Sequence, residues 1–337
     1  MDPEGRLYVN GRDGTSAQMA ALDACDGAVL ALVDLQDPQL LSGAVVSAMT
    51  LDGPDLIVTG TQGNNPADNP QAFFARLSRP DLSQRWLQPL FGGPNGSEGW
   101  DVTLDVDGSV YVLGATSDPS FWVVRGDDAG HACGWTPASP GAGRAAATGF
   151  ASVWLAGTIG NQIALQAYQG WCDPQVICAC PPVLDVRADL PDAAYGEARA
   201  LAIGPNHVYV AGATNGPFAD NNFRGVLLVE NGANPLATLT SWDPTPDMDA
   251  FMGVAIAGNR AYVAADAGMA SIDAGFDEGV QGHLLVIDLD TGNVDADYPL
   301  GAGLARGVAL DGDTVTVVLG HEASTDVIRC PMAGPCP

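Results

Sequence analysis

A short apolar strand that ends in a small residue recurs along the whole chain. In each copy, apolar or β-branched residues lead to a glycine or, once, an alanine, and successive copies lie about fifty residues apart. This spacing is typical of one blade of a β-propeller. The seven copies of this marker strand are residues 8–11, 57–60, 111–114, 154–157, 209–212, 262–265 and 317–320.

The segments around each marker predict three further strands. Before it, a small apolar strand ends in a tight polar turn such as Asp107-Gly108 or Gly312-Asp313, dipeptides that close two-residue hairpins. After it come a variable loop and a third apolar strand, and then a weaker fourth strand, as at 85–90. We place the third strands at 29–34, 72–77, 226–230 and 283–288. Four antiparallel strands with small residues innermost form a propeller blade.

The pattern therefore predicts an all-β fold, a seven-bladed β-propeller of four-stranded antiparallel blades in one domain (1–337). Gly (42) and Pro (24) are plentiful and only 16% of residues are charged, which is typical of many short strands joined by turns. The first unit lacks the start of its innermost strand and the last keeps three clear strands. We therefore expect a longer precursor, which would also explain why no signal peptide is visible. The predicted blades are approximately 1–43, 44–97, 98–142, 143–195, 196–250, 251–304 and 305–337.

One repeat resembles a known family. Residues 72–77 read Ala-Phe-Phe-Ala-Arg-Leu, 90–93 read Leu-Phe-Gly-Gly, and 107–114 read Asp-Gly-Ser-Val-Tyr-Val-Leu-Gly. This resembles the bacterial SBBP-type β-propeller repeat, which pairs a DAFVAKL strand with a YLGG strand and a GNxYVTG strand. The resemblance is clear over about residues 72–116 and weaker in the other units. It implies an exported propeller and carries no catalytic motif.

The charge of the chain excludes several classes of partner. Net charge is −27 and no lysine occurs, so the surface repels nucleic acid and anionic lipid. The missing lysine also removes Schiff-base chemistry and a P-loop. No run of eighteen apolar residues predicts a membrane span. We expect a monomer that binds a protein or carbohydrate partner.

The cysteines indicate an oxidising compartment. Cys172 and Cys178 share the spacing of Cys330 and Cys336, and we predict local hairpin disulfides, with Cys172 joined to Cys178 or Cys180. The alternative is zinc at 172, 178 and 180, for which no fourth ligand stands nearby in sequence. The partners of Cys25 and Cys133 stay open. The expected location is extracellular, periplasmic or cell-surface.

Strand direction predicts where a site would lie. The loops after the second strands and those entering the first strands share one face, and the long variable ones are 12–27, 61–70 and 214–223. Residues just before each inner strand should surround the mouth of the central channel. We expect Trp100, Arg199 and Arg306 to lie near one another there, because each stands two residues before the first core position of its strand. The candidate ligand-binding residues are Glu98, Trp100, Asp101, Glu197, Arg199, Phe251, Met252, Arg306 and His321.

Each candidate group has a plainer alternative. Arg199 and Arg306 offer forked donors to a carboxylate or sulfate, or they pair with Glu197 and Asp101 and close the channel. His321 lies on the loop face and is the histidine placed for acid–base chemistry, whereas His207 and His283 read as structural. Oxygen ligands gather around the turn 291–293 as they do in Ca²⁺ sites, and the alternative is a solvated hairpin. The candidate metal ligands there are Asp288, Asp290 and Asp295, beside Asp297.

Two function classes follow. The leading prediction is a binding or interaction scaffold that uses its loop face to hold a partner or glycan, with no cofactor. The alternative is a propeller enzyme of the lactonase, lyase or hydrolase kind, with its chemistry at the channel mouth. An enzyme should bring several titratable groups into one pocket. Here such groups are few and mixed with apolar side chains, which favours binding.

Overall fold

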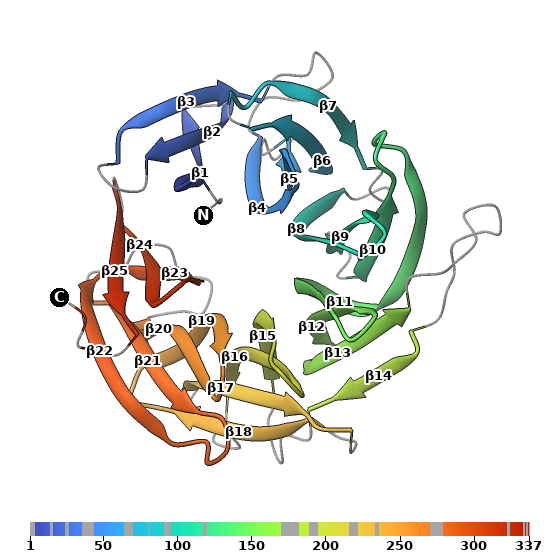
Figure 1. Cartoon of the computed structure of the whole chain (residues 1–337). Coiled ribbons are helices and arrows are strands. Elements are labelled where there is room, and N and C mark those ends of the chain that lie inside the picture. Colours follow the sequence, from blue (N-terminus) through green and yellow to red (C-terminus); the bar gives the residue numbers. More distant parts are fainter. Residues whose placement is uncertain are drawn as a thin grey trace. The chain divides into compact units, whose positions relative to one another are not determined.

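The computed structural model describes most of the chain. Its described residues are 4–13, 16–23, 27–35, 44–63, 70–79, 81–90, 96–116, 120–169, 182–188, 195–215, 222–232, 236–269, 279–321, 324–332, 334 and 336. Within these ranges every helix or strand assigned is a β-strand. The fold is an all-β, seven-bladed β-propeller, as the repeat predicts (Figure 1).

The first two blades form separate antiparallel sheets. The first sheet has the described strands β1 (Arg6–Asp13), β2 (Ser16–Asp23) and β3 (Val29–Asp34). The second has β4 (Val45–Asp52), β5 (Asp55–Gln62), β6 (Gln71–Ser78) and β7 (Gln84–Pro89).

The third and fourth blades share one long strand, β11 (Ala132–Gly149), and so count as a single seven-stranded sheet. Its other strands are β8 (Ser97–Leu104), β9 (Val110–Thr116), β10 (Ser120–Gly126), β12 (Ser152–Ile159), β13 (Gln162–Gln169) and β14 (Leu184–Arg187).

The last three blades again form separate sheets, whose strands lie side by side in chain order (Figure 1). The fifth has β15 (Tyr195–Ile203), β16 (Val208–Asn215), β17 (Phe223–Glu230) and β18 (Ala237–Trp242). The sixth has β19 (Met248–Ala257), β20 (Arg260–Met269), β21 (Gln281–Asp288) and β22 (Val294–Ala302). The seventh has the described strands β23 (Leu304–Asp311), β24 (Thr314–Gly320) and β25 (Thr325–Pro331).

One predicted strand position is wrong. Residues 29–34 are the fourth strand of the first blade, because β2 lies between them and the marker strand β1. The segment 12–27 is therefore not one long loop, since β2 occupies Ser16–Asp23. The other predicted third strands coincide with β6, β17 and β21.

The marker strands read as apolar runs because they are covered on both faces. All eight positions of β5 are buried, and so are all eight of β12. A strand buried on both faces has no polar side to alternate with. Outer strands differ: β22 alternates between exposed and half-buried positions along much of its length.

A β-bulge recurs in the innermost strand of five blades. The register between the first and second strands shifts by one residue in the pairs β4–β5, β8–β9, β15–β16, β19–β20 and β23–β24. A bulge leaves one residue unpaired and turns its side chain away from the regular alternation. The five residues at the shift, called here the bulge residues, are Ser47, Trp100, Arg199, Met252 and Arg306.

The chain divides into two compact units, Met1–Leu155 with Ala167–Val183, and Ala156–Gln166 with Leu184–Pro337. In the first unit, apolar side chains of neighbouring sheets pack into two clusters, around Phe73 and around Phe74 with Trp122. In the second unit, clusters form around Phe251 and around Tyr262. No helix in the described ranges has the length and apolar character needed to cross a membrane.

Candidate ligand site at the bulges of the inner strands

Arg199 and Arg306 occupy equivalent bulge positions in the second unit. Arg199 donates from Nη2 to Oε2 of Glu197 at 3.0 Å, and the Glu197 side chain is 3% exposed against 15% for Arg199. Arg306 is exposed. The alternative in which these arginines pair with neighbouring carboxylates predicts the ion pair between Arg199 and Glu197.

The positive charges of both arginines act on one buried carboxyl group, that of Asp266. The residue is 0% exposed on β20, and its Oδ1 accepts a hydrogen bond from the backbone N–H of Ala305 at 2.6 Å. Burial raises the pKa of Asp266 to about 7, although that hydrogen bond and the positive charges of Arg306, Arg199 and His283 all lower it. Both guanidinium groups are therefore close enough to act on one carboxyl. Glu197, Arg199, Asp266 and Arg306 are called here the arginine cluster.

The hydrogen bond of Asp266 also fixes the bulge that carries Arg306. Ala305 directly precedes Arg306, and Ala305 is itself 0% exposed. The carboxyl of one blade thus holds the backbone of the next blade at the point where Arg306 leaves the sheet. No described donor contacts Oδ2 of Asp266, which is buried.

The first unit holds a related arrangement around Trp100. The guanidinium carbon of Arg144 lies 4.0 Å from the centre of the Trp100 ring, in a cation–π contact between two inner strands. Asp101 accepts backbone hydrogen bonds from Ala146 at 2.7 Å and from Val102 at 2.8 Å. Burial raises the pKa of Asp101 to about 7, and these two hydrogen bonds oppose the increase. Trp100 belongs to a different unit from Arg199 and Arg306, so their expected proximity stays a prediction.

Two predicted ligand-binding residues differ sharply in access. Phe251 is 0% exposed and lies in the core, with its ring 6.0 Å from that of Trp242. A dissolved ligand does not reach this side chain in the structure. Met252, the next residue, is a bulge residue and is half-buried. Glu98, which directly precedes Gly99, is half-buried too.

His321 is held by a carboxylate of its own blade. Its Nε2 lies 3.0 Å from Oδ2 of Asp326, and its backbone N–H donates to the carbonyl of Ser324 at 2.8 Å. His283 is fixed in the same way, with Nδ1 2.7 Å from Oδ1 of Asp297. His207 lies 3.1 Å from the Glu230 carbonyl oxygen through Nδ1.

The carboxylates of the acidic turn between β21 and β22 contact donors of the protein itself. Oδ1 of Asp288 accepts from the backbone N–H of Thr291 at 2.8 Å and from its hydroxyl at 2.9 Å, and these bonds lower the pKa of Asp288. Asp290 accepts from Nδ2 of Asn259 at 2.9 Å, and Asp295 lies 3.8 Å from Arg260. Among the described residues, no three His, Cys, Asp or Glu side chains are grouped so as to hold a metal.

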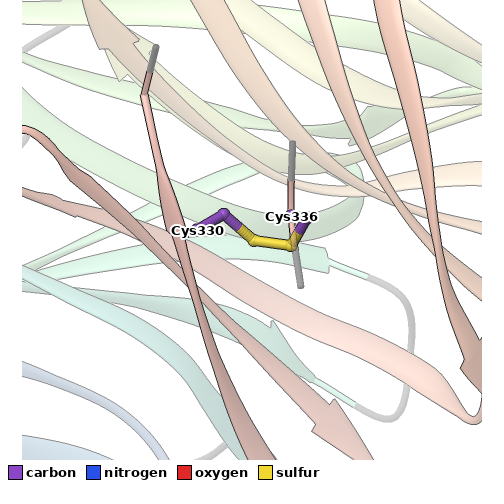
Figure 2. The surroundings of a disulfide bond; sticks show 2 residues. All are labelled: Cys330 and Cys336. Carbon is purple, nitrogen blue, oxygen red and sulfur yellow. A yellow bond between two sulfur atoms is a disulfide. The ribbon is translucent and has the colours of Figure 1, made fainter. Parts of the chain in front are cut away.

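Cys330 and Cys336 form a disulfide at the end of the last blade, as predicted from their spacing (Figure 2). Their Cα atoms are 4.6 Å apart, which is within the usual range for a disulfide. Cys25, Cys172, Cys178 and Cys180 lie outside the described residues, as does the side chain of Cys133.

Sequence reasoning missed Asp266 and Arg144. Asp266 directly follows the marker at 262–265, where the other copies have Arg, Thr, Ala or His. An aspartate at a strand position buried on both faces was the available signal, because an acid is seldom buried there without a role. Arg144 carried no comparable signal, since its partner Trp100 stands on another strand.

The fold defines the class of protein as a seven-bladed β-propeller. No protein-family model and no curated protein matches the sequence. Solved structures do match in shape. The computationally designed Ika8 protein gives a TM-score of 0.57 at 13% identity, over 97% of this chain and 81% of that one.

A quinohemoprotein alcohol dehydrogenase from Pseudomonas putida HK5 is also similar, with a TM-score of 0.52 at 13% identity. The match covers 94% of this chain and 61% of the dehydrogenase chain. At such identities the likeness shows the fold alone, because one fold hosts many functions.

Proposed function

We propose that this propeller is a binding scaffold whose arginine cluster recognises a small anionic or acidic-sugar ligand. The supporting observation is the position of Arg199 and Arg306 on equivalent bulges, both acting on the buried carboxyl of Asp266. Guanidinium groups bind carboxylate and sulfate through forked, charge-assisted hydrogen bonds. Arg306 is exposed, so an anion from solvent can reach its guanidinium group.

The wider setting of this proposal is an exported or surface-attached protein that acts as a monomer on a protein or carbohydrate partner. The Cys330–Cys336 disulfide supports an oxidising compartment. The acidic surface argues against nucleic acid as the partner. Kinship with the SBBP-type repeat and a Ca²⁺ ion at the 288–295 turn both stay predictions.

The test is a titration of Arg306→Ala with glucuronate-containing oligosaccharides, and with glucose oligosaccharides of equal length as the neutral comparison. We expect the wild-type protein to prefer the acidic sugars and Arg306→Ala to bind them tenfold or more weakly, since a hydrogen bond to a charged group contributes about 1.5–3 kcal/mol. Arg306 is exposed, so its removal should leave the melting temperature nearly unchanged.

Arg199 needs a paired substitution, because Arg199→Ala alone would leave the carboxylate of Glu197 buried without its ion pair. Glu197→Gln with Arg199→Gln removes both charges together and should also weaken binding. Arg329→Ala is the matched control, since Arg329 is 40% exposed and pairs with Asp311 in the same unit. Equal affinity of wild type and Arg306→Ala for acidic sugars would refute the proposal.

One observation favours the rival enzyme function. A carboxyl with a pKa near 7 is suited to proton transfer at neutral pH, and Asp266 has such a value. However, Asp266 is 0% exposed and uses one oxygen for the Ala305 N–H, so binding is the better proposal. Mass spectrometry of the same oligosaccharides after incubation decides: cleavage by wild type but not by Asp266→Asn would establish the enzyme.

A further inference from the structure

A cavity of about 390 Å³ lies in the second unit, away from the arginine cluster and sharing no residue with it. It opens between the outer strands of the sixth blade and the segment that follows β25. The cavity is lined mainly by Arg260, Val286, Asp295, Ala296, Tyr298 and Met332. Its volume is within the range of small-molecule sites.

The inner part of this cavity is apolar. Val286 is 6% exposed and belongs to the core cluster around Tyr262. Ala296, Tyr298 and Met332 are half-buried against the same cluster. The phenol ring of Tyr298 therefore stands at the boundary between the core and the open space, as an aromatic wall for a ligand.

The polar groups of the cavity are a loose ion pair. Nη2 of Arg260 lies 3.8 Å from Oδ2 of Asp295, and the two side chains are 51% and 40% exposed. An exposed pair at this distance contributes little free energy, so a ligand can displace it at small cost. Arg260 also lowers the pKa of Asp288, so its guanidinium acts on two carboxylates, those of Asp288 and Asp295.

The disulfide fixes the wall that Met332 provides. Met332 stands between Cys330 and Cys336, which are joined, and its backbone N–H donates to the carbonyl of Asp313 at 2.8 Å. Figure 2 shows the bond between the two sulfur atoms. The disulfide and the hydrogen bond to Asp313 both restrain the backbone near Met332.

We propose that this cavity binds a small organic ammonium ion with an apolar body. The body would pack on Val286 and Met332, and the ammonium would face the carboxylate of Asp295 and the ring of Tyr298. Aromatic rings attract such cations. The acidic chain raises the local concentration of cations around every opening of this kind. Arg260 then acts as a built-in competitor that occupies Asp295 when the cavity is empty.

If Arg260 competes with the ligand for Asp295, substitutions of these two residues should change the ligand affinity in opposite directions. Removing the positive charge with Arg260→Gln should strengthen binding of an ammonium ligand, because Asp295 loses its native partner. Removing the negative charge with Asp295→Asn should weaken it. An anionic ligand held by Arg260 would respond in the reverse way to both substitutions.

The experiment uses phenethylammonium and 3-phenylpropionate, which share an aromatic body and differ in charge, in calorimetric titrations of the full chain. We expect phenethylammonium to bind and phenylpropionate not to bind. Asp295→Asn should weaken phenethylammonium at least fivefold, Arg260→Gln should strengthen it, and Arg329→Gln should leave it unchanged. The double variant Cys330→Ser with Cys336→Ser should weaken binding, since the Met332 wall is no longer fixed.

The proposal is overturned if phenylpropionate binds better than phenethylammonium, if neither binds, or if Asp295→Asn has the same affinity as wild type. Melting curves of each variant establish that it is folded before its affinity is interpreted. The arginine cluster plays no part in this test, so Arg306→Ala should bind phenethylammonium as the wild-type protein does.

Discussion

At the scale of single residues, two carboxyl groups stand out because each joins one blade to the next. Asp266 accepts the backbone N–H of Ala305, and Asp101 accepts that of Ala146. In both cases burial raises the pKa to about 7, so that each group changes charge at neutral pH. Asp→Asn substitution keeps the acceptor oxygen and removes the titration.

Stability should therefore fall as pH rises from about 4 to about 7. In that window the folded protein holds a proton on Asp266 that the unfolded chain has lost, so the folded state binds more protons and loses stability with increasing pH. Each pKa unit corresponds to roughly 1.4 kcal/mol. Urea unfolding of Asp266→Asn at pH 5 and pH 8 should show a smaller difference than the wild type, with the variant gaining at pH 8.

Asp288→Asn is the control for this measurement. Hydrogen bonds from Thr291 lower the pKa of Asp288 from its usual 3.8, so its contribution is lost only as pH falls below that value, and Asp288→Asn should keep the wild-type difference between pH 5 and pH 8. If Asp266→Asn keeps the full pH dependence of the wild-type protein, the carboxyl does not titrate as described.

At the scale of strands, the bulge explains the marker glycine of the second, third and fifth blades, whereas in the sixth blade Ala265 stands at the equivalent place opposite Phe251. A Cβ at Gly212 would meet the backbone of Glu197 and Ala198, and a Cβ at Gly114 would meet the backbone carbonyl of Glu98. Both glycines lie opposite the residue that precedes the bulge. The bulge brings the inner strand so close to the second strand that a side chain has no room.

Gly212→Ala should accordingly lower the free energy of unfolding by about 1–3 kcal/mol, the usual cost of overpacking a buried position. Gly11→Ala is the matched control, because Gly11 holds the same marker position and a Cβ there meets no atom within 4 Å. Urea unfolding measures both. Equal loss in the two variants would mean that general strand propensity, rather than the close approach, selects glycine.

At the scale of the whole molecule, covalent and electrostatic terms act on a chain of net charge −27. Such a charge opposes compaction through self-repulsion. The Cys330–Cys336 disulfide ties the last described strand, β25, to the segment after it. Its loop is short, so the loop-closure model gives a contribution of about 2 kcal/mol.

Alkylation without reductant, followed by mass spectrometry, should leave Cys330 and Cys336 unlabelled in the natively produced protein. Cys172 should be unlabelled as well, together with Cys178 or Cys180, if the second hairpin disulfide forms as its spacing predicts. Replacing Cys330 and Cys336 by serine should lower the melting temperature by several degrees. Full labelling of all seven cysteines in the untreated protein would contradict both the disulfides and the exported location.

Much of the architecture could be predicted because it is periodic. The seven marker segments all fall within strands, namely β1, β5, β9, β12, β16, β20 and β24. The first blade was misread because residues 29–34 are more apolar than the Ala-rich β2. In the structure they form an outer strand with Leu30 52% and Leu32 60% exposed. Hydrophobicity alone did not identify the covered strand there.

The sequence by itself determined the strand class, the repeat, the marker glycines and the Cys330–Cys336 pair. These follow from local preferences and from spacing along the chain, which hairpin geometry converts directly into neighbours. Tertiary structure alone decided that Asp266 acts on both Arg199 and Arg306, that Arg144 covers Trp100, and that a cavity opens beside Tyr298. Each of these joins residues about forty or more positions apart, and their contacts depend on how one blade packs on the next.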